Sequence, residues 1–159
     1  MILNSKNYFI SDKAFVAKGV TIGEGTSIWD KATVRKGVKI GKNCNIAEGV
    51  TLEDGVIIGD NVRIANNANL YKGVVIKDNV RIGAGTCFTN NRKVSPFKKA
   101  DRYLDTIVDE GVVIGANATI VGGITIGTKV TIADGCVVVG NVPANHFVNG
   151  NPGRAKRKI

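Results

Sequence analysis

Apolar residues recur at every sixth position in two long stretches of this chain. One register holds from Ile10 to Phe88 through fourteen positions without a miss, and a second, shifted register runs from Val108 to Val138. A period of six is neither the 3.6 of a helix face nor the 2 of an alternating strand. It predicts a repeat architecture of very short strands and corners, in which each unit buries one residue against its neighbours.

The residue three positions after each apolar one is nearly always glycine or asparagine. From Gly19 to Gly85 this holds at eleven of twelve positions, and Lys31 is the exception. Both residue types tolerate a positive φ, so the column predicts a left-handed backbone corner every six residues, between strands of about four residues. After the second register begins, the column continues with Gly111, Asn117, Gly123, Lys129, Gly135 and Asn141.

The hexads, such as Val20 to Gly25, resemble the hexapeptide repeat of the left-handed parallel β-helix acyltransferases along nearly the whole chain. The resemblance implies an all-β fold, a left-handed parallel β-helix solenoid with about 18 residues per coil. Parallel strands are usually connected with a right-handed crossover, so the left-handed sense is implied by the resemblance alone. Three hexads then close a triangular coil, and Asn43, Asn61 and Asn79 are expected to stack along one edge.

A chain of 159 residues suits one domain with one continuous core. The stretch after Phe88 has no sixfold register and contains Pro96, so it predicts an extruded loop, and a long loop on a rigid solenoid favours a binding function. We assign one β-helix domain, 1–159, with an N-terminal cap (1–9), coils (10–88 and 108–141), the loop (89–107), and a C-terminal cap with a basic tail (142–159).

The charge of the chain favours an anionic ligand. Its formal net charge is +9, and basic residues crowd the loop and the C-terminus, which suits a polyphosphate. No helix-turn-helix, zinc-finger or aromatic-stacking pattern supports nucleic acid as a partner. Because no apolar run is long enough for a membrane span and the first ten residues have no signal-peptide core, we expect a soluble, cytoplasmic protein.

Cysteine and histidine are too scarce for a metal site. Cys44, Cys87 and Cys136 are too few and too far apart for a disulfide framework or a paired metal motif. Cys44 and Cys136 lie two residues before sixfold apolar positions, where a small buried residue is expected. Cys87 lies beside the loop, where a role near a ligand stays open. A γ-class carbonic anhydrase would need three histidine ligands, and His146 is the one histidine, so we expect no metal.

Four segments in order resemble the bacterial N-acetyltransferases that modify the 3-amino group of nucleotide-linked sugars. These segments are Ile28-Trp29, residues 64–71, residues 88–90 and residues 115–127. The resemblance implies acetyl-CoA as co-substrate, a nucleotide-linked amino sugar as acceptor and a role in cell-surface polysaccharide synthesis. It also implies a homotrimer whose active sites lie between subunits.

By the same resemblance Asn90 is the catalytic residue. Its side-chain carbonyl would accept a hydrogen bond from the sugar amine and orient the lone pair. A sugar amine is weakly basic, so correct orientation matters more for its reaction than deprotonation by a strong base. The alternative is a turn asparagine that closes the coil. His146 is a less favoured general base because it lies in the C-terminal cap.

The expected ligand-binding residues fall into two groups. The candidates for the acceptor are Trp29, Asn66, Asn67, Tyr71 and Thr89, and those for acetyl-CoA are Gly122, Gly123, Ala133, Gly140, Arg154 and Lys156. Asn67 is also explained by its corner. Trp29 and Tyr71 each follow a sixfold apolar position and are therefore expected at the outer surface, where the ring suits either a base or sugar or a subunit interface. The small residues would let a ligand approach the backbone, and Arg154 or Lys156 would meet a phosphate.

Two other functions stay open. An O-acetyltransferase, or an acyltransferase for another small acceptor, would be expected to use a nearby histidine base. A non-catalytic β-helix scaffold would not bind acetyl-CoA.

Overall fold

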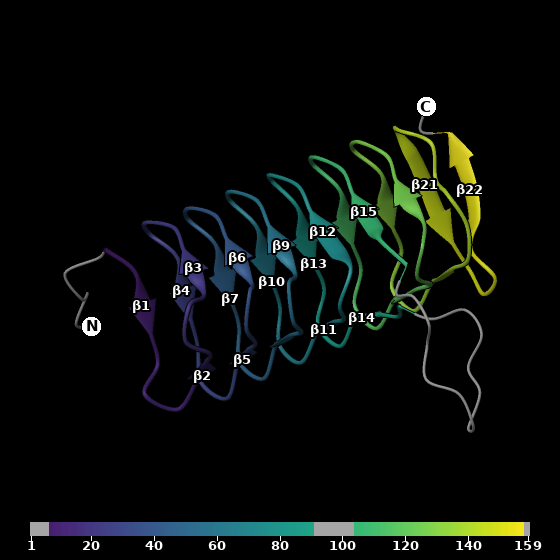
Figure 1. Ribbon diagram of the computed structural model, residues 1–159. Coiled ribbons are helices and arrows are strands. Elements are labelled where there is room, and N and C mark those ends of the chain that lie inside the picture. The colour runs from purple at the N-terminus through teal and green to yellow at the C-terminus, as the bar shows by residue number, and fades with distance from the viewer. Residues whose placement is uncertain (1–6, 91–103, 158–159) are drawn as a thin grey trace, which may run out of the picture.

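A computed structural model describes residues 7–90 and 104–157, and all the regular structure in these ranges is β-strand. The chain winds as a left-handed parallel β-helix of about 7 turns, and successive strands fall in rotation on three sheets (Figure 1). This confirms the predicted fold. None of the described elements is a helix able to cross a membrane.

Every third strand of the chain belongs to the same sheet. The nine-stranded sheet contains β1 (Phe9–Ile10), β4 (Ser27–Ile28), β7 (Asn45–Ile46), β10 (Arg63–Ile64), β13 (Arg81–Ile82), β16 (Val113–Ile114), β19 (Thr131–Ile132), β21 (His146–Asn149) and β22 (Arg154–Arg157). The seven-stranded sheet contains β2 (Phe15–Val16), β5 (Thr33–Val34), β8 (Thr51–Leu52), β11 (Asn69–Leu70), β14 (Cys87–Phe88), β17 (Thr119–Ile120) and β20 (Val137–Val138). The six-stranded sheet contains β3 (Thr21–Ile22), β6 (Lys39–Ile40), β9 (Ile57–Ile58), β12 (Val74–Ile76), β15 (Thr106–Val108) and β18 (Thr125–Ile126).

Three edges separate these sheets. The first edge is the column of corners that joins the nine- and seven-stranded sheets, as at Asn66-Asn67. The second edge joins the seven- and six-stranded sheets, as at Lys72-Gly73, and the third joins the six- and nine-stranded sheets, as at Asp60-Asn61. Strand partners lie eighteen residues apart, as Ser27 and Asn45 do, so every edge is a column of corners from successive coils.

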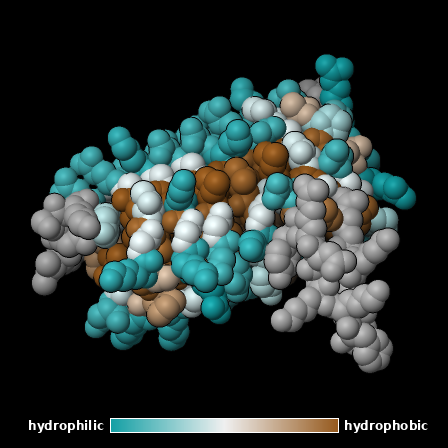
Figure 2. All heavy atoms as spheres, in the orientation of Figure 1, coloured by the Kyte–Doolittle hydropathy of each residue, from teal (hydrophilic) through white to brown (hydrophobic). Residues whose placement is uncertain are grey.

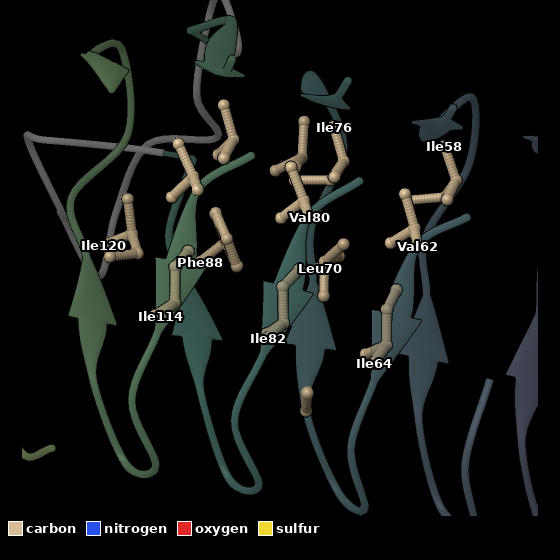
Figure 3. Close-up of a cluster of buried hydrophobic side chains, with 14 of the residues drawn as sticks. Ile58, Val62, Ile64, Leu70, Ile76, Val80, Ile82, Phe88, Ile114 and Ile120 are labelled. Atoms are coloured by element: carbon tan, nitrogen blue, oxygen red, sulfur yellow. The ribbon is translucent and has the colours of Figure 1, made fainter. Parts of the chain in front are cut away.

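The sixfold apolar positions form the core, as predicted. From Ile28 to Val138 each of them is buried, and those near the middle of the solenoid stack in columns (Figure 3). Ile10, Val16 and Ile22 are only partly buried because they belong to the first coil. Cys44 and Cys136 are buried at the predicted inward positions.

The strands are shorter than predicted, mostly two residues in place of about four. The corners explain the difference. At a typical one the N–H of Val50 donates to the carbonyl of Ala47 at 3.4 Å, so four residues of the hexad form a turn and two remain to pair with the next coil.

The predicted column of left-handed corners is confirmed from Gly19 to Gly85. Lys31, the exception by residue type, has the same conformation with a φ of 57°, and its ammonium pairs with Glu48 at 2.8 Å. Asn43, Asn61 and Asn79 stack along the third edge as expected, all with positive φ. The prediction for Asn141 is wrong, since its φ is not positive. Its side-chain oxygen instead accepts the N–H of Thr125 at 2.9 Å.

A corner can require glycine because its φ is positive or because a Cβ would not fit, and Gly55 distinguishes these two reasons. Its φ is +74°, but an added Cβ would meet no atom within 4 Å, so only backbone conformation requires glycine there. We expect Gly55→Ala to lower the free energy of unfolding by about 1 kcal/mol and Gly55→Asn to lower it less, because asparagine tolerates this conformation. Denaturant unfolding of both variants measures the difference, and equal losses would contradict the explanation.

The chain leaves and rejoins the coil at neighbouring points. The N–H of Leu104 donates to the carbonyl of Asn90 at 3.3 Å, and β15 begins at Thr106, within the range predicted as loop. Residues 91–103 of that loop lie outside the described residues. At the C-terminal end β21 continues the nine-stranded sheet beside β19, and β22 turns back antiparallel against β21 (Figure 1).

Candidate functional site

The structure places most of the predicted site residues on two edges of the β-helix. Tyr71, Thr89, Asn90, Gly122, Gly123 and Gly140 lie along the second edge, and Trp29, Asn66, Asn67 and Ala133 lie along the first. The seven-stranded sheet separates these edges within one chain. The first-edge groove around Trp29 and the second-edge groove around Asn90 share no lining residue.

Thr89 and Asn90 follow β14 at the point where the chain leaves the coil. The N–H of Thr89 donates to Ile120 at 2.9 Å, and its hydroxyl oxygen accepts the N–H of Gly122 at 3.0 Å. These bonds fix the backbone at the base of the loop. The Asn90 carboxamide makes no hydrogen bond within 7–90 and 104–157, so its carbonyl oxygen is available to a ligand.

Asn90 lines a groove of about 390 Å³ on the second edge, together with Tyr71, Lys72, Glu53 and Asp54. Tyr71 is 38% exposed, which confirms its predicted outward position. The groove combines a carboxamide, an aromatic ring, a cation and two carboxylates, a set able to hold a polyhydroxylated amine. The Glu53 carboxylate forms an ion pair with the Arg35 guanidinium, with an N–O distance of 3.3 Å.

Gly122 and Gly123 are small for a reason within the chain itself. A Cβ on Gly122 would lie 2.9 Å from the Cα of Asn90, and one on Gly123 would lie 2.9 Å from the Leu104 side chain. Gly123 also has a φ of +78°. Both glycines therefore let the two ends of the loop pack on the next coil, and their contact with a co-substrate stays a prediction.

A second groove, of about 580 Å³, lies on the first edge and is lined by Trp29, Asp30, Asn45, Glu48 and Asn66, with Ala47. Trp29 is 37% exposed, as predicted for a residue that follows a sixfold apolar position. Its indole N–H donates to the side-chain oxygen of Asn45 at 2.8 Å, which holds the ring over the nine-stranded sheet. Asn66 thus shares a groove with Trp29, and contact of either residue with an acceptor stays a prediction.

Asn67 lies at the corner beside Asn66 but does not line that groove. Its φ is 59° and its N–H donates to Glu48 at 2.9 Å, as its place in the corner column predicts.

The carboxylate of Asp30 stays ionised at this edge. Hydrogen bonds from the Ser11 hydroxyl and then the Lys13 ammonium hold the pKa of Asp30 below its ordinary value. A depressed pKa means that the contribution of these bonds to stability is present above the ordinary carboxyl range and is lost as the pH falls through the lowered value. At neutral pH the first-edge groove therefore keeps a negative charge beside Trp29.

The remaining predicted residues lie toward the C-terminal end. Gly140 is exposed with open space beside it, and Ala133 is half-buried at the first edge. Arg154 and Lys156 are exposed on β22. His146 lies on β21, where its Nδ1 contacts the carbonyl of Ala144 at 2.9 Å, on a different sheet from the strand that precedes Asn90.

Cys87 points outward from β14, between Asn69 and Thr119 of the neighbouring strands. Burial raises the pKa of its thiol, which keeps the sulfur protonated and weakly nucleophilic at neutral pH. No cluster of three or more histidine, cysteine or acidic side chains able to hold a metal ion occurs in the part of the chain that the structure describes.

Sequence reasoning missed Glu53, Asp54, Asn45 and Glu48 as groove residues. The eighteen-residue period could have identified two of them, because Glu53 lies eighteen positions before Tyr71 and Glu48 lies eighteen positions before Asn66. Residues related in this way occupy adjacent coils on one edge.

The eighteen-residue coil, the left-handed corners and the edge grooves define a hexapeptide-repeat β-helix protein. The model described as "Bacterial transferase hexapeptide (six repeats)" matches residues 19–54 and 55–90, and "Hexapeptide repeat of succinyl-transferase" matches residues 37–72 and 105–140. Since these matches together span most of the coils, the chain belongs to the bacterial hexapeptide-repeat transferase family.

Curated relatives resemble only part of the chain. The 2,3,4,5-tetrahydropyridine-2,6-dicarboxylate N-acetyltransferase of Clostridium perfringens is 42% identical over 53 residues, which cover 33% of this chain and 22% of that protein. The enzyme of the same name from Alkaliphilus metalliredigens is 43% identical over the same length. The match thus spans about a fifth of these relatives.

Solved structures share the fold along nearly the whole chain. A UDP-N-acetylglucosamine acyltransferase from Bacteroides fragilis has a TM-score of 0.79 at 21% identity, covering 94% of this chain and 60% of that one. The acetyltransferase domain of PglB from Neisseria gonorrhoeae, in complex with acetyl coenzyme A, has a TM-score of 0.65 at 22% identity, with coverages of 95% and 58%. A histidine-to-alanine variant of GDP-perosamine N-acetyltransferase from Caulobacter crescentus, in complex with CoA and GDP-perosamine, has a TM-score of 0.61 at 22% identity, with coverages of 94% and 56%.

Proposed function

We propose that this protein is an acetyl-CoA-dependent N-acetyltransferase that acts on the 3-amino group of a nucleotide-linked amino sugar, in the cytoplasm, for cell-surface polysaccharide synthesis. The observation that carries the proposal is the Asn90 carboxamide, which makes no hydrogen bond to the described residues and lies on the rim of the second-edge groove beside Tyr71. The acetyltransferase relatives and structural neighbours support the reaction class.

In the reaction, the amine nitrogen attacks the thioester carbonyl carbon of acetyl-CoA. The new C–N bond forms, the C–S bond breaks, CoA leaves as the thiolate, and the proton lost by the nitrogen passes through water to that thiolate. Asn90 Oδ1 would accept a hydrogen bond from the amine and so aim its lone pair at the carbonyl. Such positioning is worth most in a groove from which bulk water is displaced.

A homotrimer would bring the two edges together. Within one chain Asn90 and Asn66 lie on different edges, so the first edge of a neighbouring copy placed against the second edge would complete the site. Ile57, which is 42% exposed, pairs with Val75, and Val75 with Ile107, on the outer face of the six-stranded sheet. Figure 2 shows this apolar band across the middle of that face, where association would cover it.

The co-substrate would lie along the coils between neighbouring copies. Gly140, with open space beside it, would let the pantetheine arm approach the backbone. Gly122 and Gly123 lie on the same edge one coil earlier, and the Ala133 of a neighbouring copy would lie across from them if its first edge faced this second edge. Arg154 and Lys156 on β22 would meet the phosphates of CoA.

Release of free CoA thiol from acetyl-CoA, with a panel of acceptors, tests the proposal. We expect release with nucleotide-linked 3-amino sugars and none with the matching 3-hydroxyl sugars. Turnover with hydroxyl acceptors alone would overturn the choice of an amine and favour an O-acetyltransferase. An unchanged melting temperature at saturating acetyl-CoA would favour a non-catalytic scaffold, because a ligand that binds only the folded state must stabilise it.

One observation favours a second acceptor class. The aligned relatives from two species are named as N-acetyltransferases of a cyclic dicarboxylate. The same thiol assay with 2,3,4,5-tetrahydropyridine-2,6-dicarboxylate distinguishes the two acceptors, and turnover with the dicarboxylate alone would replace the sugar as the substrate.

A further inference from the structure

Two arginines lie side by side on the outer face of the nine-stranded sheet. Arg63 on β10 pairs directly with Arg81 on β13, and both side chains are exposed. The outward positions on the neighbouring strands carry no acidic residue. In order along the sheet they are Ser27, Asn45, Arg63, Arg81, Val113 and Thr131.

No ion pair within the described part of the chain neutralises this pair of charges. The ion pairs among residues 7–90 and 104–157 join Lys13 to Asp30, Lys31 to Glu48, and Arg35 to Glu53, and neither Arg63 nor Arg81 takes part. Like charges directly opposite on adjacent strands destabilise a sheet, so the arrangement costs folding free energy unless an anion binds between them.

The acidic residues in the same hexads are engaged elsewhere. The Asp60 carboxylate accepts the N–H of Lys42, and the Asp78 carboxylate accepts the N–H of Asp60, both at 2.7 Å. These bonds join successive coils along the third edge and direct each carboxylate toward the backbone.

The arginine pair lines a groove that shares Asn45 with the groove of Trp29. Arg63 and Arg81 border a space of about 320 Å³ together with Asn45, Ala65 and Gly83. Asn45 also lines the first-edge groove, and it is the residue that holds the Trp29 indole. Two strand spacings, about 10 Å, separate β4 from β10, so an aromatic ring and two guanidinium groups lie along one path.

We propose that Arg63 and Arg81 bind the diphosphate of a nucleoside diphosphate whose base packs against Trp29. Guanidinium groups bind phosphate oxygens through paired N–H donors, and two of them one strand spacing apart, about 4.8 Å, match two linked phosphates better than one. The assignment rests on the proposed function, for which it locates the nucleotide half of the acceptor on the outer face of the nine-stranded sheet.

Trp29 provides a direct readout because it is the single tryptophan of the chain. Titration with UDP, GDP and dTDP in the absence of acetyl-CoA is expected to quench its fluorescence. In the Arg63→Gln/Arg81→Gln variant we expect the Kd for these diphosphates to rise at least tenfold, with a smaller rise for the monophosphates. The matched control is Lys42→Gln/Lys77→Gln, which removes two exposed charges from the third edge and is expected to leave the Kd within twofold.

An unchanged Kd in the arginine variant would overturn the proposal. So would a loss confined to CoA, which carries its own diphosphate, because the pair would then serve the co-substrate. If amino sugars are acetylated although diphosphate binding ignores the arginines, this assignment fails alone. If no acceptor is acetylated and the variant still loses diphosphate binding, the nucleotide site stands and the proposed reaction fails.

Discussion

Replacement of Asn90 by alanine is expected to lower kcat/KM for acetyl transfer at least tenfold, a loss of about 1.4 kcal/mol or more in transition-state stabilisation. The Asn90 side chain makes no hydrogen bond with the described part of the chain, so its removal should leave the fold intact. The backbone bond between Asn90 and Leu104 does not depend on the side chain. The loss would arise because the attacking amine no longer has an acceptor to orient it.

The measurement is the rate of CoA thiol release over a range of acceptor concentrations. Asn79→Gly is a suitable control, since it removes an exposed carboxamide from the third edge, where no predicted site residue lies, and glycine keeps the positive φ of 59°. We expect the control to retain activity within about twofold. Wild-type rates for Asn90→Ala would place the chemistry at another residue.

Phe88→Ala is expected to lower the free energy of unfolding by about 3–5 kcal/mol. Phe88 is fully buried and belongs to the core column of the seven-stranded sheet, where Leu70 and Ile120 are its partners on adjacent strands (Figure 3). Truncation would leave a cavity in a core only one coil wide, which has few neighbours able to relax into the space.

Phe15→Ala is the matched control, because Phe15 is 59% exposed on β2 and its loss should cost no more than about 0.5 kcal/mol. Denaturant unfolding of both variants gives the comparison. An equal decrease in the free energy of unfolding of the two variants would show that the core column does not stabilise this coil. Amide exchange at Thr89 and Asn90 extends the test, since faster exchange there in Phe88→Ala would show that this core residue holds the base of the loop.

The sequence predicted the fold well because the repeat is a local property. Each apolar residue needs only its own hexad to be placed inward, and each corner needs only a residue that tolerates positive φ. Residue type alone does not identify every corner, because Lys31 adopts the corner conformation although it is neither glycine nor asparagine. Asn141 is the converse case, because its coil ends at the C-terminal strands and its side chain caps Thr125 instead.

The sequence by itself determined the core columns, the corners, the outward positions of Trp29 and Tyr71, and the place where the register is lost beside Asn90. Only the tertiary structure decided which side chains share a groove. Closure of the coil separates Asn66 from Asn90, joins Trp29 to Asn45, and places Arg63 beside Arg81 across adjacent strands. The physical reason is that the hexad sets the direction of each side chain, whereas its neighbours come from the coils before and after, which the chain reaches only by folding.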